Sequence, residues 1–305
     1  MYDIIVVGGG PAGMTAALYA QRNGKQSLVI EKNGFGGQIT HSPKVENYPG
    51  TMQMSGNEFA DRTLDQILAQ GAEIEFERVV AVEDAGDHKV VLTEEGGRYE
   101  AQAVILATGV KHRMLGLEGE NELIGEGISF CAVCDGDFYS GQTVCVAGGG
   151  NSALQEAILL SEKCREVIVL QDLEKCTGEQ RLQDVLFSRP NTRLIADTKI
   201  NRLLTENGAF RGVEIEARST GKKQLIPCDG LFVAIGLIPE NEPFKDLADL
   251  NRYGYFDSDE GCATRTPGVF VAGDCRSKGV RQLATAIADG ATAALAACRY
   301  INEKP

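Results

Sequence analysis

Two cysteines separated by two residues and followed by an acid are the residues of this sequence best suited to chemistry: Cys131-Ala-Val-Cys134-Asp135. A CxxC pair can close a small disulfide, and a helix that begins at the motif can lower the pKa of one thiol through its dipole. A carboxyl group at Asp135 can give a proton to a departing sulfur or take one from it. The alternatives are half of a zinc site and two buried thiols, but no second CxxC and no Cys/His pair at finger spacing supplies further zinc ligands. The motif therefore favours redox chemistry.

A glycine-rich turn near the N-terminus is typical of dinucleotide binding. Residues 2–7 are rich in β-branched residues, which predicts a buried parallel strand. Three glycines then fill the GxGxxG pattern: Gly8, Gly10 and Gly13. A helix is expected over 14–22, and its N-terminus would meet a pyrophosphate. The next expected strand, 28–31, ends in Glu31, whose carboxylate suits a ribose hydroxyl.

The same strand, turn and helix return later in the chain. Residues 143–147 predict the strand and 148–153 the turn, and alignment without gaps places Gln171 at the position of Glu31. The second turn therefore keeps its glycines but lacks the ribose carboxylate. Asp172 lies one residue further on, where a side chain at a strand end usually points elsewhere. The second half is either a nucleotide domain or a Rossmann-like half that packs without binding a nicotinamide nucleotide.

Each half closes on a buried strand that ends in glycine, at 103–109 and at 230–236, and each of these strands follows hairpin-like alternation. A third such strand, 269–274, lies after the second half and is expected to return to the first. We therefore expect an α/β protein with two Rossmann-like, three-layer ββα nucleotide-binding domains, the second inserted into the first. Three segments define the expected domains: 1–115 and 244–305 for the two parts of the first domain, and 116–243 for the inserted domain that carries the CxxC pair.

The composition excludes several classes of function. The net charge of -13 argues against binding to nucleic acid and to an anionic membrane surface, since both require a basic face. The nine cysteines are scattered without a regular framework, which favours a cytoplasmic location. Met1 runs directly into a strand, which leaves no room for a signal peptide, and the Ala-rich run 283–298 predicts a buried helix rather than a membrane span. The other seven cysteines have no spaced partner, and the three histidines fit no metal spacing.

Together these motifs resemble the low-molecular-weight thioredoxin reductases from end to end. The motifs that carry the resemblance are GGGPAG at 8–13, GGQ at 36–38, ENYPG at 46–50, ATG at 107–109, CAVCDG at 131–136, GGGNSA at 148–153 and AGDCRSKGVRQ at 272–282. The resemblance implies that FAD binds to the first domain, and that Cys131 and Cys134 form a redox disulfide with Asp135 as its acid/base. It also implies FAD contacts at the glycines Gly8, Gly10 and Gly13 and at ten further residues: Glu31, Gly37, Gln38, Asn47, Ala107, Thr108, Gly109, Gly273, Asp274 and Gln282.

The sequence departs from this family where NADPH binds. Typical members carry a His-Arg-Arg run after the second strand, whereas residues 171–174 read QDLE, and its acids would repel a 2′-phosphate. Gln155 replaces the first of two acids that typical members have in the helix after the glycines. NADH-using relatives carry a Glu where Gln171 stands. An NAD(P)H site is therefore doubtful, and the departures are similar to those of the ferredoxin-dependent or pyridine-nucleotide-independent members.

The resemblance implies a flavin-dependent disulfide oxidoreductase of the thioredoxin reductase type. Electrons pass from a donor to FAD and then to the Cys131–Cys134 disulfide, and a freed thiolate, expected at Cys131, attacks the disulfide of a thioredoxin-like protein. The expected donor is ferredoxin or another non-nucleotide compound rather than NADH, and is not NADPH. Two alternatives stay open: an NAD(P)H-dependent thioredoxin or peroxiredoxin-system reductase, and a non-catalytic flavin redox sensor. The resemblance also implies a homodimer.

Overall fold

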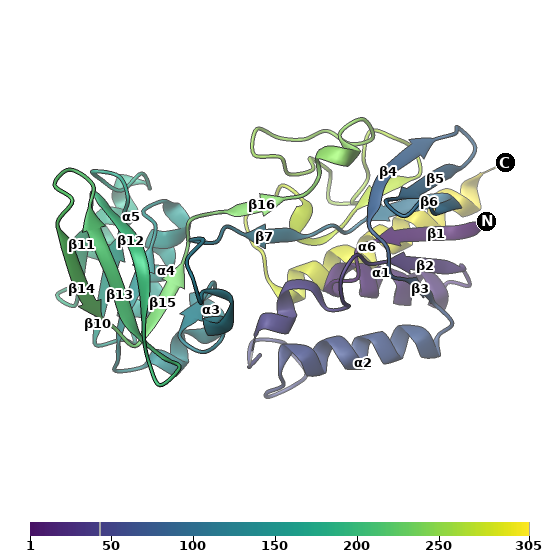
Figure 1. Cartoon of the computed structure of the whole chain (residues 1–305). Helices are drawn as coiled ribbons and strands as arrows, with labels where there is room; N and C mark the ends of the chain where they lie inside the picture. The colour runs from purple at the N-terminus through teal and green to yellow at the C-terminus, as the bar shows by residue number, and fades with distance from the viewer. Residues whose placement is uncertain (43, 305) are drawn as a thin grey trace. The chain divides into compact units, whose positions relative to one another are not determined.

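The computed structural model describes residues 1–42 and 44–304 (Figure 1). The chain divides into two compact units: unit 1 comprises Met1–Lys111 with Ile238–Pro305, and unit 2 comprises His112–Leu237. Two short strands at the crossings, β7 (Val110–His112) and β16 (Leu237–Pro239), pair with each other. Unit 2 is therefore an insertion in unit 1. The sequence predicts functional domains that meet at 115/116 and 243/244, and these bounds stay a prediction.

Unit 1 contains a seven-stranded sheet in the order β3-β2-β1-β6-β5-β4, and β17 also pairs with β6. Its strands are β1 (Tyr2–Val7), β2 (Ser27–Ile30), β3 (Glu73–Glu75), β4 (Val79–Asp84), β5 (Lys89–Thr93), β6 (Arg98–Leu106) and β17 (Val269–Val271). Strand β6 is parallel to β1, its first half pairs antiparallel with β5, and its second half pairs parallel with β17. The predicted return of the third strand to the first half is thus confirmed. One continuous strand, β6, replaces the separate hairpin arm and buried strand that the sequence predicts.

Alternate side chains of β1 face two different layers, as the period of a strand requires. Ile4 and Val6 pack against α1 (Pro11–Arg22) and α6 (Leu283–Glu303), while Val7 faces the opposite layer with Phe256. A third helix, α2 (Gly56–Ala69), begins at Ser55, whose side chain accepts the backbone N–H of Glu58. Short 3-10 turns in this unit include η1 (Gly37–His41), η4 (Glu242–Phe244) and η5 (Gly273–Cys275). No helix within the described ranges is long and apolar enough to cross a membrane.

Unit 2 has a parallel sheet and an antiparallel sheet. The parallel strands, in the order β11-β10-β9-β15-β8, are β8 (Ile128–Ser129), β9 (Thr143–Ala147), β10 (Glu166–Leu170), β11 (Thr192–Ile195) and β15 (Gly230–Val233). The antiparallel strands are β12 (Thr198–Glu206), β13 (Ala209–Ala217) and β14 (Lys223–Pro227). The helices are α3 (Ala132–Asp135), α4 (Asn151–Ser161) and α5 (Gln180–Phe187). Val144 and Val146 of β9 pack against α4, whereas Cys145 packs against the antiparallel sheet.

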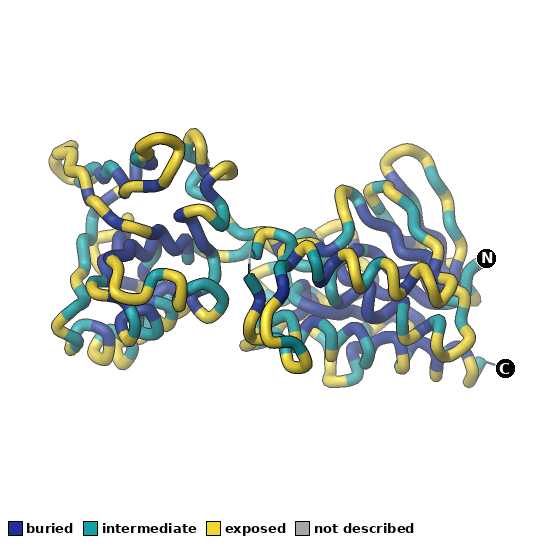
Figure 2. The backbone as a smooth tube through the Cα atoms, turned by 90° about the horizontal axis from the view of Figure 1, so that it is seen from below, coloured by how far each residue is buried: buried dark blue, intermediate teal, exposed yellow. Residues whose placement is uncertain are grey.

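In both units helices cover one face of the parallel strands. The antiparallel strands β4 and β5 belong to the same sheet in unit 1, whereas β12, β13 and β14 form a separate sheet in unit 2. Figure 2 shows that the buried residues gather in the strands and on the inner helix faces of each unit. The predicted fold class, two Rossmann-like three-layer domains with the second inserted into the first, is confirmed. The carboxyl ends of β1 in unit 1 and β9 in unit 2 each lead into a glycine turn and a helix N-terminus, which is the place where ligands bind in such sheets.

Candidate functional site

The cysteines of the CxxC motif form a disulfide in unit 2. Cys131 and Cys134 are bonded with their Cα atoms 5.3 Å apart, and Cys131 is the N-cap of α3. Helix α3 has only four residues, so the sulfur of Cys131 is influenced by one local donor rather than by a long helix dipole. That donor is the backbone N–H of Cys134, which lies 3.2 Å from Cys131 Sγ. An N–H directed at this sulfur favours its thiolate form over that of its partner.

Asp135 lies half-buried directly after the pair. Ser129 Oγ donates to Asp135 Oδ2 at 2.6 Å and accepts the N–H of Cys131 at 3.1 Å. Asp135 Oδ1 is buried and accepts no hydrogen bond from the residues that the structure describes. Burial raises the pKa of Asp135, and the bond from Ser129 opposes that rise. Asp135 therefore keeps its proton to a higher pH than a surface aspartate, which suits proton exchange with a sulfur.

The glycine turn after β1 combines close packing with open space. A Cβ at Gly8, which has φ +110°, would lie 2.3 Å from the carbonyl oxygen of Ala107, and a Cβ at Gly13 would lie 1.8 Å from that of Gly8. These two glycines let the end of β6 and helix α1 approach β1. At Gly10 a Cβ would meet only Gly36 O, at 4.0 Å. The N-terminus of α1 is therefore accessible to a phosphate.

Glu31 lies at the end of β2, beside this turn. Its two carboxylate oxygens accept the backbone N–H groups of Gly9 at 2.6 Å and Asn33 at 2.9 Å. Each oxygen keeps a lone pair that can accept a ribose hydroxyl. Gly37 begins η1 with φ +60°, and Gln38 follows it with its side chain exposed. The predicted contacts of this segment are therefore placed on the same edge as the open turn.

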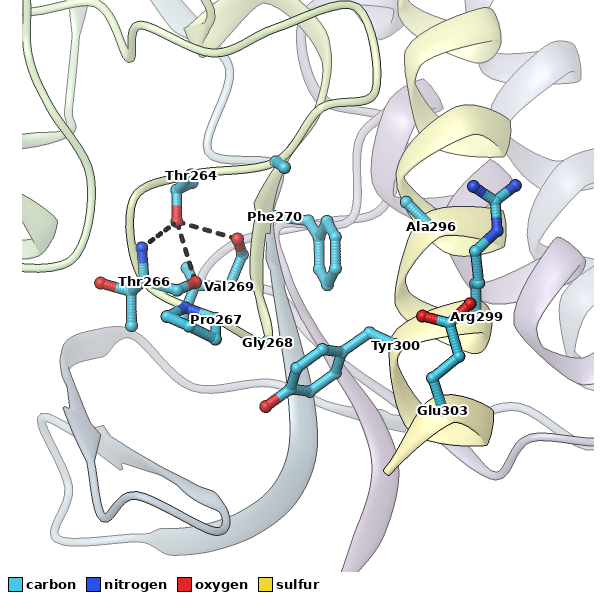
Figure 3. Close-up of a pocket in the computed structure, with 11 residues that line it drawn as sticks. Thr264, Thr266, Pro267, Gly268, Val269, Phe270, Ala296, Arg299, Tyr300 and Glu303 are labelled. Atoms are coloured by element: carbon cyan, nitrogen blue, oxygen red, sulfur yellow. Dashed lines mark hydrogen bonds between the residues drawn. The ribbon is translucent and has the colours of Figure 1, made fainter. Parts of the chain in front are cut away.

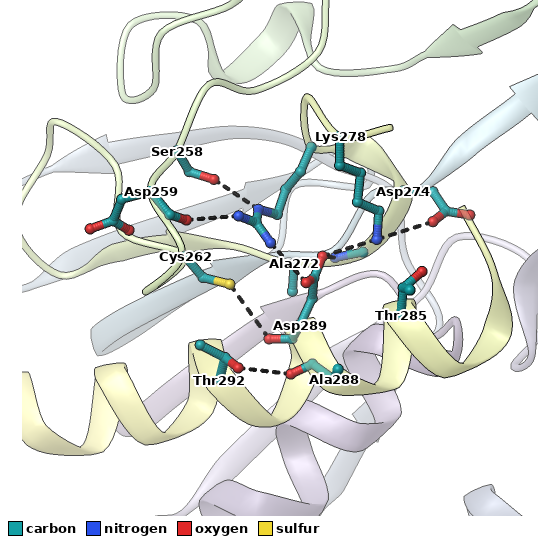
Figure 4. A network of polar contacts seen from close by, with 12 residues as sticks. Ser258, Asp259, Cys262, Ala272, Asp274, Lys278, Thr285, Ala288, Asp289 and Thr292 are labelled. Carbon is teal, nitrogen blue, oxygen red and sulfur yellow. Dashed lines mark hydrogen bonds and ion pairs between the residues drawn. The ribbon is translucent and has the colours of Figure 1, made fainter. Parts of the chain in front are cut away.

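Strand β17 brings Asp274 back to unit 1, in η5 (Figure 4). Its Oδ1 atom is buried and has no hydrogen-bond partner among the described residues, and the nearest cation is Lys278 Nζ at 3.5 Å. Burial raises the pKa of Asp274, while Lys278 and Arg281 oppose the rise. Gly273, just before it, donates its N–H to Asp289 Oδ2 at 3.0 Å. A buried carboxyl oxygen with only this long ion pair can still accept a hydrogen bond, which fits a ligand rich in hydroxyl groups.

Two further pairs join distant segments of unit 1. Asn47 Nδ2 donates to Gln282 Oε1 at 3.2 Å, which brings two predicted contacts together. Thr108 Oγ1 donates to Asn241 Oδ1 at 2.7 Å, just before Gly109, whose φ is +65°. The buried Asn241 was missed by sequence reasoning, because its partners are remote and no pattern marks it. With the open turn at the start of α1 and the unpartnered oxygen in η5, the residues of unit 1 fit FAD.

The glycine turn of unit 2 is lined differently. Gln171 is buried, and its side chain donates to Lys175 O at 3.2 Å and accepts the N–H of Asp172 at 3.1 Å. A Cβ on Gly149 would lie 2.7 Å from this side chain, so Gln171 fills the place beside the turn that Glu31 fills in unit 1. Asp172 pairs with Arg218 at 3.3 Å. Sequence reasoning missed Arg218, because it considered only cations that follow the strand closely.

An acidic side chain stands at the N-terminus of α4. Asn151 Nδ2 donates to Glu179 Oε1 at 3.0 Å, and the N–H of Glu179 donates to Asn151 Oδ1 at 2.7 Å. The neighbouring N–H groups of Thr177 and Gly178 both donate to the carbonyl oxygen of Gly149. The segment before α5 is thus fastened to the glycine turn. A carboxylate at this helix end repels a pyrophosphate.

The other seven cysteines are all buried. Burial raises the pKa of Cys164 and of Cys262 to about 11, which makes these thiols poor nucleophiles. Cys228, next to Cys145, and burial both raise the pKa of the Cys145 thiol. No group of acids, histidines and cysteines within the described residues could hold a metal ion.

A hollow in unit 1 lies away from the predicted site residues. It encloses about 250 Å³ between the loop 263–270 and the end of α6 (Figure 3). Phe270 and Tyr300 line it, and their rings contact each other edge to face at 6.3 Å between centroids. None of the predicted contacts lines this hollow.

Comparison with known proteins places the chain in a family. The model of the pyridine nucleotide-disulphide oxidoreductases matches residues 2–290. The chain is 39% identical to a 34.2 kDa protein of the rubredoxin operon of Clostridium pasteurianum, over 99% of this chain and 98% of that protein. It is 37% identical to the thioredoxin reductase of Listeria monocytogenes, over 99% of this chain and 95% of that enzyme. The crystal structure of thioredoxin reductase from Streptococcus pyogenes superposes with a TM-score of 0.94 at 37% identity, covering 100% of this chain and 99% of that one. The chain therefore belongs to the pyridine nucleotide-disulphide oxidoreductase family, within its low-molecular-weight thioredoxin reductase group, and is an FAD-dependent oxidoreductase.

Proposed function

We propose that this enzyme reduces the disulfide of a thioredoxin-like protein with electrons from a donor other than NADPH. The observation that carries the proposal is the Cys131–Cys134 disulfide at the start of α3, followed by an acid whose burial raises its pKa. A sensor without catalytic activity has no chemical need for a vicinal dithiol beside such an acid. Similarity to thioredoxin reductases over nearly the whole chain supports the same substrate class.

The dithiol form of the enzyme carries out the exchange. The Cys131 thiolate, favoured by the N–H of Cys134, attacks one sulfur of the partner's disulfide, and the other partner sulfur leaves and takes up a proton. Cys134 then attacks the Cys131 sulfur, which re-forms the internal disulfide and releases the partner as a dithiol. Asp135 takes the proton from the Cys134 thiol and returns one when the internal disulfide is opened again. Val133, between the cysteines, is 56% exposed and is available for contact with the partner.

FAD is assigned to unit 1, and when bound it supplies the two electrons that open the internal disulfide. When FAD is bound, the N-terminus of α1 would hold the pyrophosphate next to Gly10, and Glu31 would accept the ribose hydroxyl. Asp274, whose Oδ1 atom lies 3.5 Å from Lys278 Nζ, would offer its carboxylate to a further hydroxyl of the ligand. The other assigned contacts are Gly8, Gly13, Gly37, Gln38, Asn47, Ala107, Thr108, Gly109, Gly273 and Gln282.

Three side chains of unit 2 support a donor other than NADPH. Gln171 replaces the ribose carboxylate, and Asp172 is an anion in the stretch where typical members carry arginines. Glu179 presents a carboxylate at the N-terminus of α4, where a pyrophosphate would have to bind. Ferredoxin or another non-nucleotide donor is favoured over NADH, because the acid that NADH users carry is absent and Glu179 places a carboxylate at the helix end. Two features favour the opposite reading: Arg218 offers a cation beside Asp172, and a Cβ at Gly150 would meet only Thr177 Oγ1, at 3.9 Å.

An anaerobic titration of the flavin tests the donor. The purified enzyme is mixed separately with NADPH, NADH and reduced ferredoxin, and flavin absorbance is followed. We expect neither nicotinamide to bleach the flavin rapidly, while dithionite and reduced ferredoxin do. Rapid bleaching by NADPH would contradict the proposal. If Arg218→Ala slows that bleaching and Arg181→Ala, at an exposed control position, does not, unit 2 is a working NADPH site.

Two further elements of the proposal concern the state of the enzyme in the cell. We assign it to the cytoplasm, since its dithiol cycle requires reducing partners. We also assign it a homodimeric state, which sedimentation equilibrium of the FAD-loaded enzyme tests. A monomer at all concentrations would contradict that assignment without affecting the redox chemistry.

A further inference from the structure

A second carboxyl group is buried beside Asp135. Glu156 belongs to α4, which packs against α3. A Cβ added to Gly136, the residue after Asp135, would lie 3.3 Å from the side chain of Leu160. Leu160 and Glu156 are four residues apart in α4 and therefore lie on the same face of the helix. Gln155, by contrast, points to solvent. The helix therefore directs Glu156, and not its neighbour, toward the acid of the redox motif.

Both carboxyl groups have an oxygen without a partner. Glu156 Oε2 and Asp135 Oδ1 are buried, and neither receives a hydrogen bond from any residue in the described ranges. Burial, followed by repulsion from Asp135, raises the pKa of Glu156 to about 8. Two buried carboxylates that interact in this way cannot both be ionised at neutral pH without a large cost. One proton held by the pair removes that cost.

The other titratable groups around the pair do not supply a positive charge. Tyr139 of the 3-10 turn η3 (Gly136–Tyr139) has its pKa raised to about 12 by burial, by Asp135 and by Cys228, so it stays neutral. The Ser129 hydroxyl is the one side-chain donor to Asp135. No ammonium or guanidinium group of the described chain lowers the pKa of Asp135 or Glu156. The pair must therefore balance its charge with a proton rather than with a cation.

We propose that Glu156 is a positioning residue for the dithiol chemistry, which shares one proton with Asp135 and makes it available when the internal disulfide is opened. The inference deepens the proposed function and rests on it, since it concerns the proton of the same disulfide. Glu156 acts through Asp135 and need not contact the sulfur atoms itself. The two acids behave as one unit with a single negative charge in the oxidised enzyme.

The step balances with an external dithiol as reductant. Dithiothreitol gives up two electrons and two protons and becomes a cyclic disulfide, while the Cys131–Cys134 bond breaks. The one proton that the carboxyl pair holds passes from Asp135 to the Cys134 sulfur, Cys131 stays a thiolate, and the two protons of dithiothreitol go to solvent. The carboxyl pair then regains a proton from solvent. The Cys131 thiolate repels the negative charge of the pair and so raises the pKa of Glu156, and reduction near that pKa should therefore take up more protons from solvent than it does when residue 156 cannot ionise.

Carboxyl titrations of the oxidised, FAD-loaded enzyme test the sharing directly. In protein with ¹³C-labelled carboxyl groups, we expect Glu156 to titrate near pH 8 in the wild type. Asp135→Asn should move the Glu156 midpoint to lower pH, since it removes the charge that repels the Glu156 carboxylate. Glu122→Gln, an exposed acid of unit 2, is the matched control and should leave that midpoint unchanged. A wild-type Glu156 that titrates in the ordinary range of glutamates, or that ignores Asp135→Asn, overturns the inference.

Proton uptake on reduction is the second measurement. Between about pH 8 and 9, wild-type enzyme reduced by dithiothreitol should bind more protons than Glu156→Gln, read with a pH indicator. Equal uptake also overturns the inference. Neither measurement requires turnover with a thioredoxin-like protein. An enzyme that reduces such a protein but shows no shared proton loses only this inference, and one that shows the shared proton but no turnover loses the proposed function.

Discussion

The hydroxyl of Ser129 donates a 2.6 Å hydrogen bond to the carboxylate of Asp135. The same oxygen accepts the N–H of Cys131, so one side chain connects the acid to the first cysteine of the disulfide. Ser129 is the last residue of β8, and it pairs with Phe232 of the neighbouring β15. The position of the acid is therefore set by the edge of the parallel sheet and not by the short α3 alone.

Replacing Ser129 with Ala should raise the pKa of Asp135 further. The Ser129 bond is the one influence that opposes burial, so its loss leaves the desolvation of the carboxylate uncompensated. The pH–rate profile for reduction of a thioredoxin-like protein should shift to higher pH. Ser129→Thr keeps the hydroxyl and should restore the profile, whereas an unchanged profile in Ser129→Ala would mean that Asp135 does not set the rate.

Cys131→Ser and Cys134→Ser should each lower disulfide reduction by at least about a hundredfold, because each removes one sulfur of the exchange. Cys145→Ser is the control, since that thiol is buried in the core of unit 2 on β9. It should retain turnover and lose a little stability. The assay is single-turnover reduction of a thioredoxin-like protein by prereduced enzyme. Full activity in Cys134→Ser would rule out the internal disulfide as an intermediate.

The fold was predictable because its signals are local. A buried apolar strand followed by a glycine turn and a helix occurs twice in the sequence, and parallel strands buried on both faces leave that pattern. Strand β6 was not predictable as a single element. Its first half is half-exposed in a hairpin and its second half is buried between two parallel strands, so the alternation changes within one element and reads as two.

The Cys131–Cys134 disulfide was predictable because a motif carries it, whereas the FAD contacts at the first glycine turn and at Asp274 stay predictions. The site was not predictable where a side chain works through a distant partner. Thr108 and Asn241 are 133 residues apart, and Asp172 and Arg218 are 46 apart. No spacing rule connects such pairs, because the contact exists only after the sheets have formed.

Asp289→Asn should weaken the retention of FAD. Asp289 on α6 pairs with Arg276 Nη1 at 2.8 Å and Lys278 Nζ at 3.1 Å, and it also accepts the N–H of Gly273, the residue before Asp274 (Figure 4). All these charged groups are largely buried, and removing one partner of a buried charge cluster costs about 3–5 kcal/mol. We expect lower thermal stability of unit 1 and faster loss of flavin fluorescence quenching.

The control for this change is Asp61→Asn, an exposed acid on α2 of the same unit. It should leave flavin retention as in the wild type. If both variants release FAD at the wild-type rate, then Asp289 does not hold the loop of Asp274 in its binding position.

Gly290→Ala should destabilise the packing of α6 on α1. Alanine is favoured over glycine inside a helix by about 1 kcal/mol, so helix propensity alone predicts a gain. A Cβ at Gly290, however, would lie 2.1 Å from Ala12 O and 3.1 Å from Thr15 Cβ. Separating the two helices should cost about 1–3 kcal/mol, measured by urea unfolding. Gly34→Ala, where a Cβ meets nothing within 4 Å, should be neutral, and a stabilised Gly290→Ala would show that the helices adjust without cost.

Glu156→Gln should change how stability depends on pH. Burial and Asp135 raise the pKa of Glu156 from 4.5 to about 8, so the folded state binds this proton more tightly than the unfolded chain does. The protonated Glu156 contributes its full share to the free energy of unfolding below pH 4.5. That share is lost as pH rises toward about 8, at up to about 1.4 kcal/mol per pH unit. Glutamine does not ionise, so the melting temperature of the variant should rise relative to that of the wild type between pH 5 and pH 8. Glu122→Gln should instead follow the wild-type curve. Parallel curves for wild type and Glu156→Gln would mean that Glu156 is ionised in the folded enzyme at neutral pH.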